Sequence, residues 1–259
     1  MNNLELALKA VKEASTAIMD IYLNKKIETT IKEDNSPVTQ ADLLADKIIA
    51  QNLSLSNYPI LSEETVDNPT RLEHDYIWIV DPIDGTKDFI ARTDEFTVNV
   101  ALCYKQRIIL GVIAVPAKSL IYYAEKGKGS YKVNLKTNTT ERIFTNKSSD
   151  NLTILFSNFH VSETELNLPK IFPIIKNIKR CGSAYKSCLI AEGEGHVYIK
   201  LSEGTKEWDV APSSIIVSEA GGFFGLPNGD ELLFNKKDVY NHLGVMALNY
   251  YNTNLFTKY

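Results

Sequence analysis

The chain has 259 residues, of which 44% are hydrophobic and 23% are charged, a composition that is ordinary for a globular protein. It contains 28 basic and 32 acidic residues, so its formal net charge is −4. The chain lacks the basic excess that would indicate a nucleic-acid groove or attraction to an anionic membrane surface. No apolar run approaches the roughly 18 residues that a membrane-spanning helix needs. The sequence therefore predicts a globular protein that binds neither nucleic acid nor membrane.

The three cysteines, Cys103, Cys181 and Cys188, lack the C-x-x-C spacing of metal and redox motifs. A disulfide framework requires an even number of cysteines and is typical of shorter secreted chains. The first 20 residues mix Lys and Glu with Leu, Ala and Val at helical spacing, and they lack the apolar block of a signal peptide. We therefore expect reduced thiols and a cytoplasmic location.

The first half of the chain is expected to form two helices and then a run of strands. Apolar residues at three-to-four spacing predict helices at 3–23 and 41–53, the second with Thr39 as its N-cap. The other elements expected here are a strand at 26–31, a turn at 34–37, an apolar stretch at 59–61, a strand at 76–80, a brief helix after Gly85, and strands at 97–104, 108–115, 120–124 and 130–133. Short breaks with Gly or Pro between the last four strands indicate an antiparallel meander.

The second half alternates strands with helices, which predicts a second α/β layer set. The elements expected here are a strand at 152–156, a helical section at 163–176 broken by Pro169 and Pro173, a strand at 178–181, a helix at 183–191, a strand at 196–199, a long helix at 208–220 and a strand at 222–224. The mostly polar segment 137–149 is the best internal boundary. It divides the chain into an N-terminal α+β subdomain (1–145) and a C-terminal α/β subdomain (146–259).

The most informative segment is DPIDGT at residues 81–86. An apolar strand delivers Asp81 into a turn, where Pro82 fixes one backbone angle and Asp84 follows. The carbonyl oxygen of Ile83, between the two carboxylates, can face the same centre. Hard cations such as Mg²⁺ prefer oxygen ligands in near-octahedral geometry. The turn therefore predicts a site for a divalent cation.

The same segment also predicts a phosphate site. Gly85 lets a ligand approach the backbone closely, and Thr86 opens a short helix. Free N–H groups at the start of a helix attract phosphate. One hexapeptide could therefore hold a metal on one side and a phosphate on the other.

Further acids are candidates for the same site. Glu63 and Glu64 follow an apolar stretch, Asp209 lies near the start of the long helix, and Asp42 lies in the first turn of the second helix. Each has an ordinary alternative, because a lone Glu-Glu pair is usually solvated and an Asp at a helix start is usually a cap. Acids from both halves of the chain must converge if the site exists.

Several segments together resemble motifs of the inositol monophosphatase superfamily of lithium-sensitive, Mg²⁺-dependent phosphatases. They are SPVTQAD at 36–42, SEE at 62–64, DPIDGT at 81–86, CGSA at 181–184, WDVAP at 208–212 and EAGG at 219–222. Because they fall in family order and span about residues 32–222, the resemblance is specific. It implies an α/β (α+β) fold, the layered α-β-α-β-α sandwich of the inositol monophosphatase and fructose-1,6-bisphosphatase type. It also implies two or three Mg²⁺ ions, a small phosphorylated substrate and a homodimer.

The resemblance assigns roles to individual residues. The implied metal ligands are Glu63 rather than Glu64, Asp81, the Ile83 carbonyl, Asp84 and Asp209, the last shared between metals. Thr86, helped by Asp42 or Glu63, would orient the attacking water, and the Gly85 and Thr86 amides would hold the phosphate. No Cys, Ser or His nucleophile is then needed, and none of His74, His160, His196 and His242 lies in a recognisable catalytic setting.

Two details resemble the 3'(2'),5'-bisphosphate nucleotidase branch of that superfamily. The motif continues as GTKDF at 85–89, close to that branch's Gly-Thr-Lys-Glu-Phe, with Asp88 in place of Glu. Lys186 stands where that branch also has a Lys, and a lysine would offset the extra charge of a bisphosphate. The resemblance thus implies hydrolysis of adenosine 3',5'-bisphosphate to AMP and phosphate. The implied substrate contacts are Asp84, Gly85, Thr86, Lys87, Gly182, Ser183 and Lys186.

The sequence also allows other functions. An inositol-1-monophosphatase or a sugar-phosphate phosphatase would use the same metal chemistry, and Lys87 and Lys186 could be solvated surface residues. A non-catalytic nucleotide- or metal-binding protein could keep the fold, whereas a structural interaction protein would leave the acidic cluster without purpose. The charged loop 203–207 could touch the leaving group, and residues 250–259 are expected to form only a stub of the family's closing helix.

Overall fold

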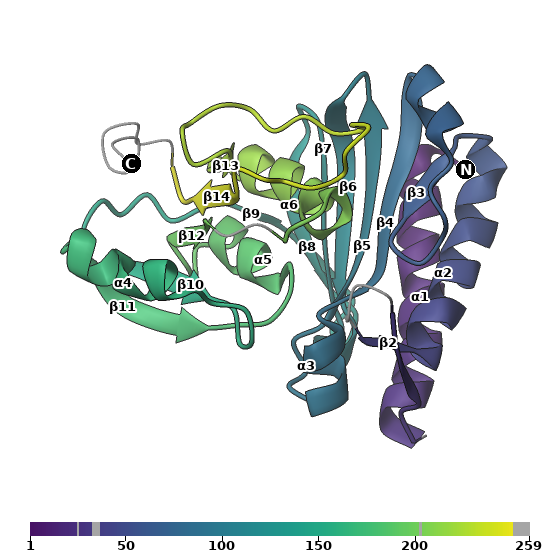
Figure 1. The fold of residues 1–259 in the computed structure, drawn as a ribbon, viewed down its shortest axis with the longest axis horizontal. Coiled ribbons are helices and arrows are strands. Elements are labelled where there is room, and N and C mark those ends of the chain that lie inside the picture. The colour runs from purple at the N-terminus through teal and green to yellow at the C-terminus, as the bar shows by residue number, and fades with distance from the viewer. Residues whose placement is uncertain (25, 33–36, 202–203, 251–259) are drawn as a thin grey trace.

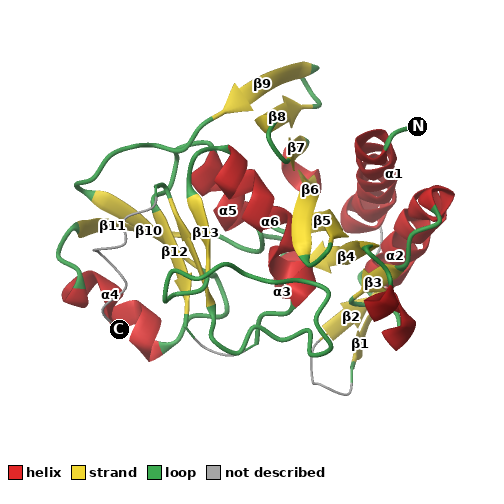
Figure 2. Cartoon of the chain, turned by 90° about the horizontal axis from the view of Figure 1, so that it is seen from above, coloured by secondary structure: helices red, strands yellow, loops and turns green. Residues whose placement is uncertain are grey.

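The computed structural model describes residues 1–24, 26–32, 37–201 and 204–250, which form five stacked layers (Figure 1). The helices are α1 (Asn3–Asn24), α2 (Gln40–Leu53), α3 (Thr86–Ala91), α4 (Glu163–Ile171), α5 (Tyr185–Ala191) and α6 (Glu207–Glu219). Helices α1 and α2 cover one face of a large sheet, and α5 and α6 lie between that sheet and a smaller one (Figure 2). Helix α4 covers the outer face of the smaller sheet. The predicted α-β-α-β-α sandwich is confirmed.

The large sheet has seven strands in the order β3-β4-β5-β6-β7-β8-β9, and all neighbours are antiparallel except β3 and β4. The strands are β3 (Ile60–Ser62), β4 (Tyr76–Asp84), β5 (Thr97–Tyr104), β6 (Arg107–Val115), β7 (Leu120–Glu125), β8 (Gly129–Asn134) and β9 (Thr139–Ile143). The predicted meander is confirmed. Strand β9 lies inside the segment predicted to be a polar boundary. Because it is an edge strand whose first four residues are exposed, it has no apolar alternation to reveal it.

The smaller sheet has the order β11-β10-β12-β14-β13 and mixes parallel with antiparallel pairs. Its strands are β10 (Leu152–Phe156), β11 (Ile175–Arg180), β12 (Val197–Lys200), β13 (Phe223–Gly225) and β14 (Val245–Leu248). Strand β14 was not predicted, although its four residues are all buried between two neighbours. The predicted break at Pro169 is wrong, because α4 continues through this proline to Ile171 and ends before Pro173.

Smaller differences concern the ends of elements. The strand predicted at 26–31 is only β1 (Thr29–Ile31), because it pairs with a three-residue partner, β2 (Pro37–Thr39). Residues 34–36 of the predicted turn, residue 203 of the charged loop and the expected stub at 251–259 lie outside the described residues. Short 3₁₀ turns complete the first half: η1 (Ser54–Ser56), η2 (Pro69–Glu73) and η3 (Pro116–Lys118).

Helix α6 joins the two halves of the chain. Its apolar side chains share one buried cluster with residues of the large sheet, such as Ile113, and of the smaller sheet, such as Val245. A Cβ atom on Gly111 of β6 would lie 2.7 Å from Ile215 Cγ2 and 2.8 Å from Pro212 Cα. The helix therefore approaches the sheet as closely as a glycine permits.

Three further expectations can be compared with the structure. All three cysteines are buried and free, as predicted. Among the described helices, none is both long enough and apolar enough to cross a membrane. The division at residues 145 and 146 stays a prediction. The two halves share a buried core that contains side chains of both.

Adding a methyl group at Gly111 tests this packing. We expect Gly111→Ala to lower the free energy of unfolding by about 1–3 kcal/mol, because the new atom would force α6 away from β6. Urea denaturation measures the loss. The matched control is Val66→Ala at a side chain that is 94% exposed, where the change should stay within about 0.5 kcal/mol. Equal stability of the Gly111 variant and the control would contradict the close contact.

Candidate active site

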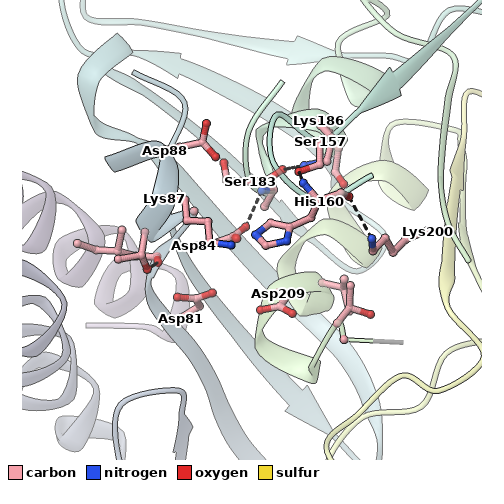
Figure 3. A pocket seen from close by; sticks show the side chains of 18 of the residues that line it. Asp81, Asp84, Lys87, Asp88, Ser157, His160, Ser183, Lys186, Lys200 and Asp209 are labelled. Carbon is pink, nitrogen blue, oxygen red and sulfur yellow. Dashed lines mark hydrogen bonds between the residues drawn. The ribbon is translucent and has the colours of Figure 1, made fainter. Parts of the chain in front are cut away.

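Three aspartates from distant parts of the chain meet between the end of β4 and the start of α6 (Figure 3). Asp81 and Asp84 come from β4, and Asp209 comes from the first turn of α6. One carboxylate oxygen of each residue lies within 4.8 Å of the other two. The structure thus brings together acids that are more than a hundred residues apart.

These acids line a cavity of about 420 Å³. The predicted site residues that line it are Glu63, Asp81, Ile83, Asp84, Gly85, Thr86, Lys87, Ser183, Lys186 and Asp209. Glu63 lines the cavity and Glu64 does not, and the preference for Glu63 as a ligand stays a prediction. Gly204 and Thr205 of the charged loop also reach the cavity. Asp42 and Gly182 do not line it.

The electrostatics of the aspartates fit a bound cation. Burial, reinforced by the neighbouring carboxylates, holds the pKa values of Asp81 and Asp209 well above their usual range. Burial raises the pKa of Asp84 to about 6, even though the positive charge of Lys186 opposes the change. Asp81 Oδ1 is buried and has no hydrogen-bond partner among the described residues. An all-oxygen set with one orphaned atom suits a hard divalent cation.

Hydrogen bonds orient two of these carboxylates. Asp84 Oδ2 accepts the main-chain N–H of Ala184 at 2.6 Å and the side-chain amide of Asn99 at 3.3 Å. Neither bond uses Oδ1. Asp209 Oδ2 accepts the main-chain N–H of Lys206 at 2.7 Å, which caps the start of α6. Each acid is therefore held by one oxygen, which leaves the other for a ligand.

Asp42 reaches the cavity through Thr86. Thr86 Oγ1 lies 3.4 Å from Asp42 Oδ1 and 3.4 Å from the carbonyl oxygen of Ile83. Asp42 Oδ2 accepts the N–H of Thr39 at 2.8 Å and its hydroxyl at 2.5 Å, so the N-cap predicted for α2 is part of a capping box. Burial raises the pKa of Asp42, and the bonds from Thr39 oppose that change. The Thr86 hydroxyl thus links a buried acid to the cavity.

Lys32 is a charged neighbour that no sequence pattern indicated. Its Nζ lies 3.2 Å from Glu63 Oε1 and 2.6 Å from Glu64 Oε1. Burial raises the pKa of Glu64 to about 7, although Lys32 opposes this. Lys32 therefore offsets part of the negative charge at the edge of the site.

A basic wall, formed by Lys87, His160, Lys186 and Lys200, also lines the cavity. Desolvation and the charges of the three lysines lower the pKa of His160. Lys200 Nζ donates to the carbonyl oxygen of His160 at 3.1 Å. Figure 3 shows His160 between Asp84 and Lys200. His160 and Lys200 were not predicted, because neither lies in a motif and only the fold places them together.

Lys186 is the most deeply buried member of the basic wall, with 5% exposure. Its Nζ donates to the carbonyl oxygen of Ser183 at 2.6 Å and lies 5.2 Å from the ring centre of Tyr198. The alternative that Lys186 is a solvated surface residue is therefore wrong. Lys87 is exposed but reaches the cavity.

Gly182 has a packing role, and its predicted substrate contact stays a prediction. Its N–H donates to Glu95 Oε2 at 3.0 Å, and an added Cβ would lie 2.6 Å from Asp88 Cγ. The adjacent Ser183 has a φ of +49°, and its hydroxyl donates to the carbonyl oxygen of Glu95 at 2.7 Å. Glu95 therefore fixes this turn, with Ser183 on the cavity and Gly182 behind it.

The fold and the site define a class of protein that can hold divalent cations beside a cavity for a small anionic molecule. The family model described as "Inositol monophosphatase family" matches residues 2–258. The chain therefore belongs to the inositol monophosphatase family and is a phosphatase, a hydrolase of phosphoric monoesters.

Individual relatives agree with this assignment. The 3'(2'),5'-bisphosphate nucleotidase CysQ of Escherichia coli K12 is 33% identical over 224 residues, which cover 84% of this chain and 88% of that protein. CysQ of Buchnera aphidicola is 36% identical over 232 residues, which cover 85% and 82%. The crystal structure of CysQ from Bacteroides thetaiotaomicron has a TM-score of 0.82 and 34% identity, and covers 95% of this chain and 96% of that chain.

Replacing Asp84 by asparagine should stabilise the metal-free chain but reduce the stabilisation that Mg²⁺ provides. The pKa of Asp84 rises from 3.8 to about 6 on folding, so its stabilising effect is present below pH 3.8 and is lost as the pH rises through 6. At pH 7.5 in EDTA we expect Asp84→Asn to be more stable than the unsubstituted chain, by on the order of 2 kcal/mol. The difference should vanish near pH 4.

Thermal unfolding measures both halves of this prediction. Added Mg²⁺ should raise the Tm of the unsubstituted chain, because a ligand that binds only the native state stabilises it. The Asp84→Asn variant should gain much less. An unchanged Tm in EDTA together with a full gain from Mg²⁺ would contradict the role of Asp84.

Proposed function

We propose that this phosphatase is a Mg²⁺-dependent 3'(2'),5'-bisphosphate nucleotidase that hydrolyses adenosine 3',5'-bisphosphate to AMP and phosphate. The observation that carries the proposal is a single cavity that is lined both by the acidic cluster and by the basic wall of Lys87, His160, Lys186 and Lys200. A substrate with two phosphates could use both walls, because cations bind phosphate through charge-assisted hydrogen bonds. The names of the curated CysQ relatives support the same substrate.

Mg²⁺ is the cation that the donor set supports best. Carboxylates and a carbonyl oxygen are hard ligands, and the described cavity wall offers no thiolate beside them. We propose Glu63, Asp81, the Ile83 carbonyl, Asp84 and Asp209 as the ligands of two or three ions. When bound, Mg²⁺ supplies positive charge to the phosphate oxygens and lowers the pKa of water.

Thr86 and Asp42 would orient the attacking water. The Thr86 hydroxyl donates to Asp42 Oδ1, so its oxygen can accept a hydrogen bond from a water in the cavity. The raised pKa of Asp42 makes this carboxylate a better proton acceptor than an exposed one. The N–H groups of Gly85 and Thr86, at the start of α3, would hold the phosphate.

Removing the Thr86 hydroxyl tests this role. We expect Thr86→Val to lower kcat by about 10²- to 10⁴-fold, because the water loses the group that orients it and accepts its hydrogen bond. Steady-state phosphate release measures kcat, and the Tm gain with Mg²⁺ should persist. Thr86→Ser is the matched control and should retain most of the activity. A Thr86→Val enzyme with unchanged kcat would contradict the proposal.

The two phosphates can be separated with a pair of substrates. Adenosine 3',5'-bisphosphate and 3'-AMP share the scissile bond, but only the first has a 5'-phosphate for the basic wall. We expect Lys200→Gln to raise KM about tenfold or more for the bisphosphate and much less for 3'-AMP. Lys9→Gln, on the exposed side of α1, is the control and should change neither value. Equal effects of Lys200→Gln on both substrates would contradict a second phosphate site.

The alternative within the family is an inositol-1-monophosphatase or sugar-phosphate phosphatase. Such an enzyme would use the same acids and would need no second anion site. Faster phosphate release from inositol 1-phosphate than from adenosine 3',5'-bisphosphate would favour it. Absence of turnover with either substrate at saturating Mg²⁺ would favour a non-catalytic binding protein. Lithium inhibition, a homodimer and a cytoplasmic location stay predictions, and the three buried free cysteines support the last.

A further inference from the structure

A fully buried glutamate lies two residues before Asp209. Glu207 has 0% exposure, and each of its carboxylate oxygens accepts one main-chain N–H: that of Asn235 at 2.6 Å and that of Lys236 at 2.8 Å. Glu207 does not line the cavity. Its contacts therefore serve the start of α6 and do not touch a substrate directly.

Arg71 connects Asn235 and Lys236 to the segment between β3 and β4. It is 2% exposed, and its guanidinium donates to Asn235 Oδ1 at 2.5 Å and to the carbonyl oxygen of Lys236 at 2.9 Å. Two further bonds, at 2.7 and 2.9 Å, reach the carboxylate of Asp67. Arg71 lies in η2, between β3 and β4. Glu63 follows β3, and Asp81 and Asp84 lie in β4. The network thus ties the segment between β3 and β4 to Asn235 and Lys236.

Residues 235–241, which we name the strap, also bond to the segment that leads into α6. The N–H of Glu207 donates to the carbonyl oxygen of Val239 at 2.9 Å, and the N–H of Asn241 donates to that of Thr205 at 2.9 Å. Lys206, whose N–H orients Asp209, forms an isolated β-bridge with Tyr240. The strap therefore fastens the turn that carries Asp209.

We propose that Arg71 and Glu207 are positioning residues that set the place of Asp209 relative to Asp81 and Asp84, and thereby the affinity for Mg²⁺. The inference rests on the proposed metal site. Metal ligands must be held within about 0.5 Å of their productive geometry. Loss of a partner behind the ligands typically weakens metal binding by about 10- to 100-fold.

The other end of α6 offers a matched control. There Glu219 accepts the main-chain N–H groups of Gly127 at 2.7 Å and Gly129 at 2.8 Å. The chemistry is the same as at Glu207: one glutamate carboxylate bridges two amides and fastens the helix. Only Glu207 is close to Asp209, so a general effect on helix stability can be separated from an effect on the metal site.

The test is calorimetric titration of Mg²⁺ into the metal-stripped full-length chain. We expect Glu207→Gln to raise the Kd for Mg²⁺ about tenfold, because the turn that carries Asp209 loses one of its fixed contacts. Arg71→Lys keeps the positive charge but loses the planar guanidinium, and it should also raise the Kd for Mg²⁺. Glu219→Gln should leave the Kd within about twofold of the unsubstituted value. It should lower the Tm in EDTA, because the far end of α6 loses a fixed contact.

The outcomes distinguish this inference from the proposed function. Equal Kd values for the unsubstituted chain and the Glu207→Gln variant would overturn the inference and leave the metal site intact. Absence of Mg²⁺ binding by the unsubstituted chain would overturn both. If Glu207→Gln does not fold, Asn235→Gly provides the test, because it removes the side-chain bonds to Arg71 and glycine accepts the φ of +55° at this position. A raised Kd for that variant supports the inference, and an unchanged Kd overturns it.

Discussion

Burying several carboxylates at one point is the constraint on which the rest of the structure depends. Burial, reinforced by the negative charges of neighbouring carboxylates, raises the pKa values of Asp81, Asp84 and Asp209. A protein can keep such groups together only if other interactions hold them in place. Packing and main-chain hydrogen bonds hold these groups here, and a bound cation would supply the missing opposite charge.

The holding interactions come from the whole fold and not from the motif alone. The N–H of Ala184, in the second half of the chain, fixes Asp84, and the close contact of Gly111 with α6 sets how far Asp209 stands from the sheet. Buried polar networks of this kind are stable only when each member has a partner. Arg71, Glu207 and the strap fulfil that condition behind the site, whereas Asp81 Oδ1 has no partner among the described residues. Asp81 Oδ1 belongs to the carboxylate cluster, where a bound cation could contact it.

The cavity also separates opposite charges over a short distance. The acidic cluster attracts cations, and the lysines of the basic wall, Lys87, Lys186 and Lys200, attract anions. The wall draws on segments that follow β4, β10 and β11 and on the last residue of β12, so it exists only in the folded chain.

The sequence by itself determined the local chemistry and most of the elements. Residues 81–86 are contiguous, so their turn, acids and helix start could be predicted without a fold. Periodicity predicted α1 and α2 because each has a buried face, and short breaks with Gly or Pro predicted the meander. Edge strand β9 was missed because its side chains are mostly exposed, and Lys32, His160 and Lys200 were missed because an isolated basic residue carries no pattern. Only the tertiary structure decided which distant residues share the cavity, that Gly182 lies behind it, and that a strap holds α6. These are contacts between segments far apart in the chain, and their partners are chosen by packing and not by spacing.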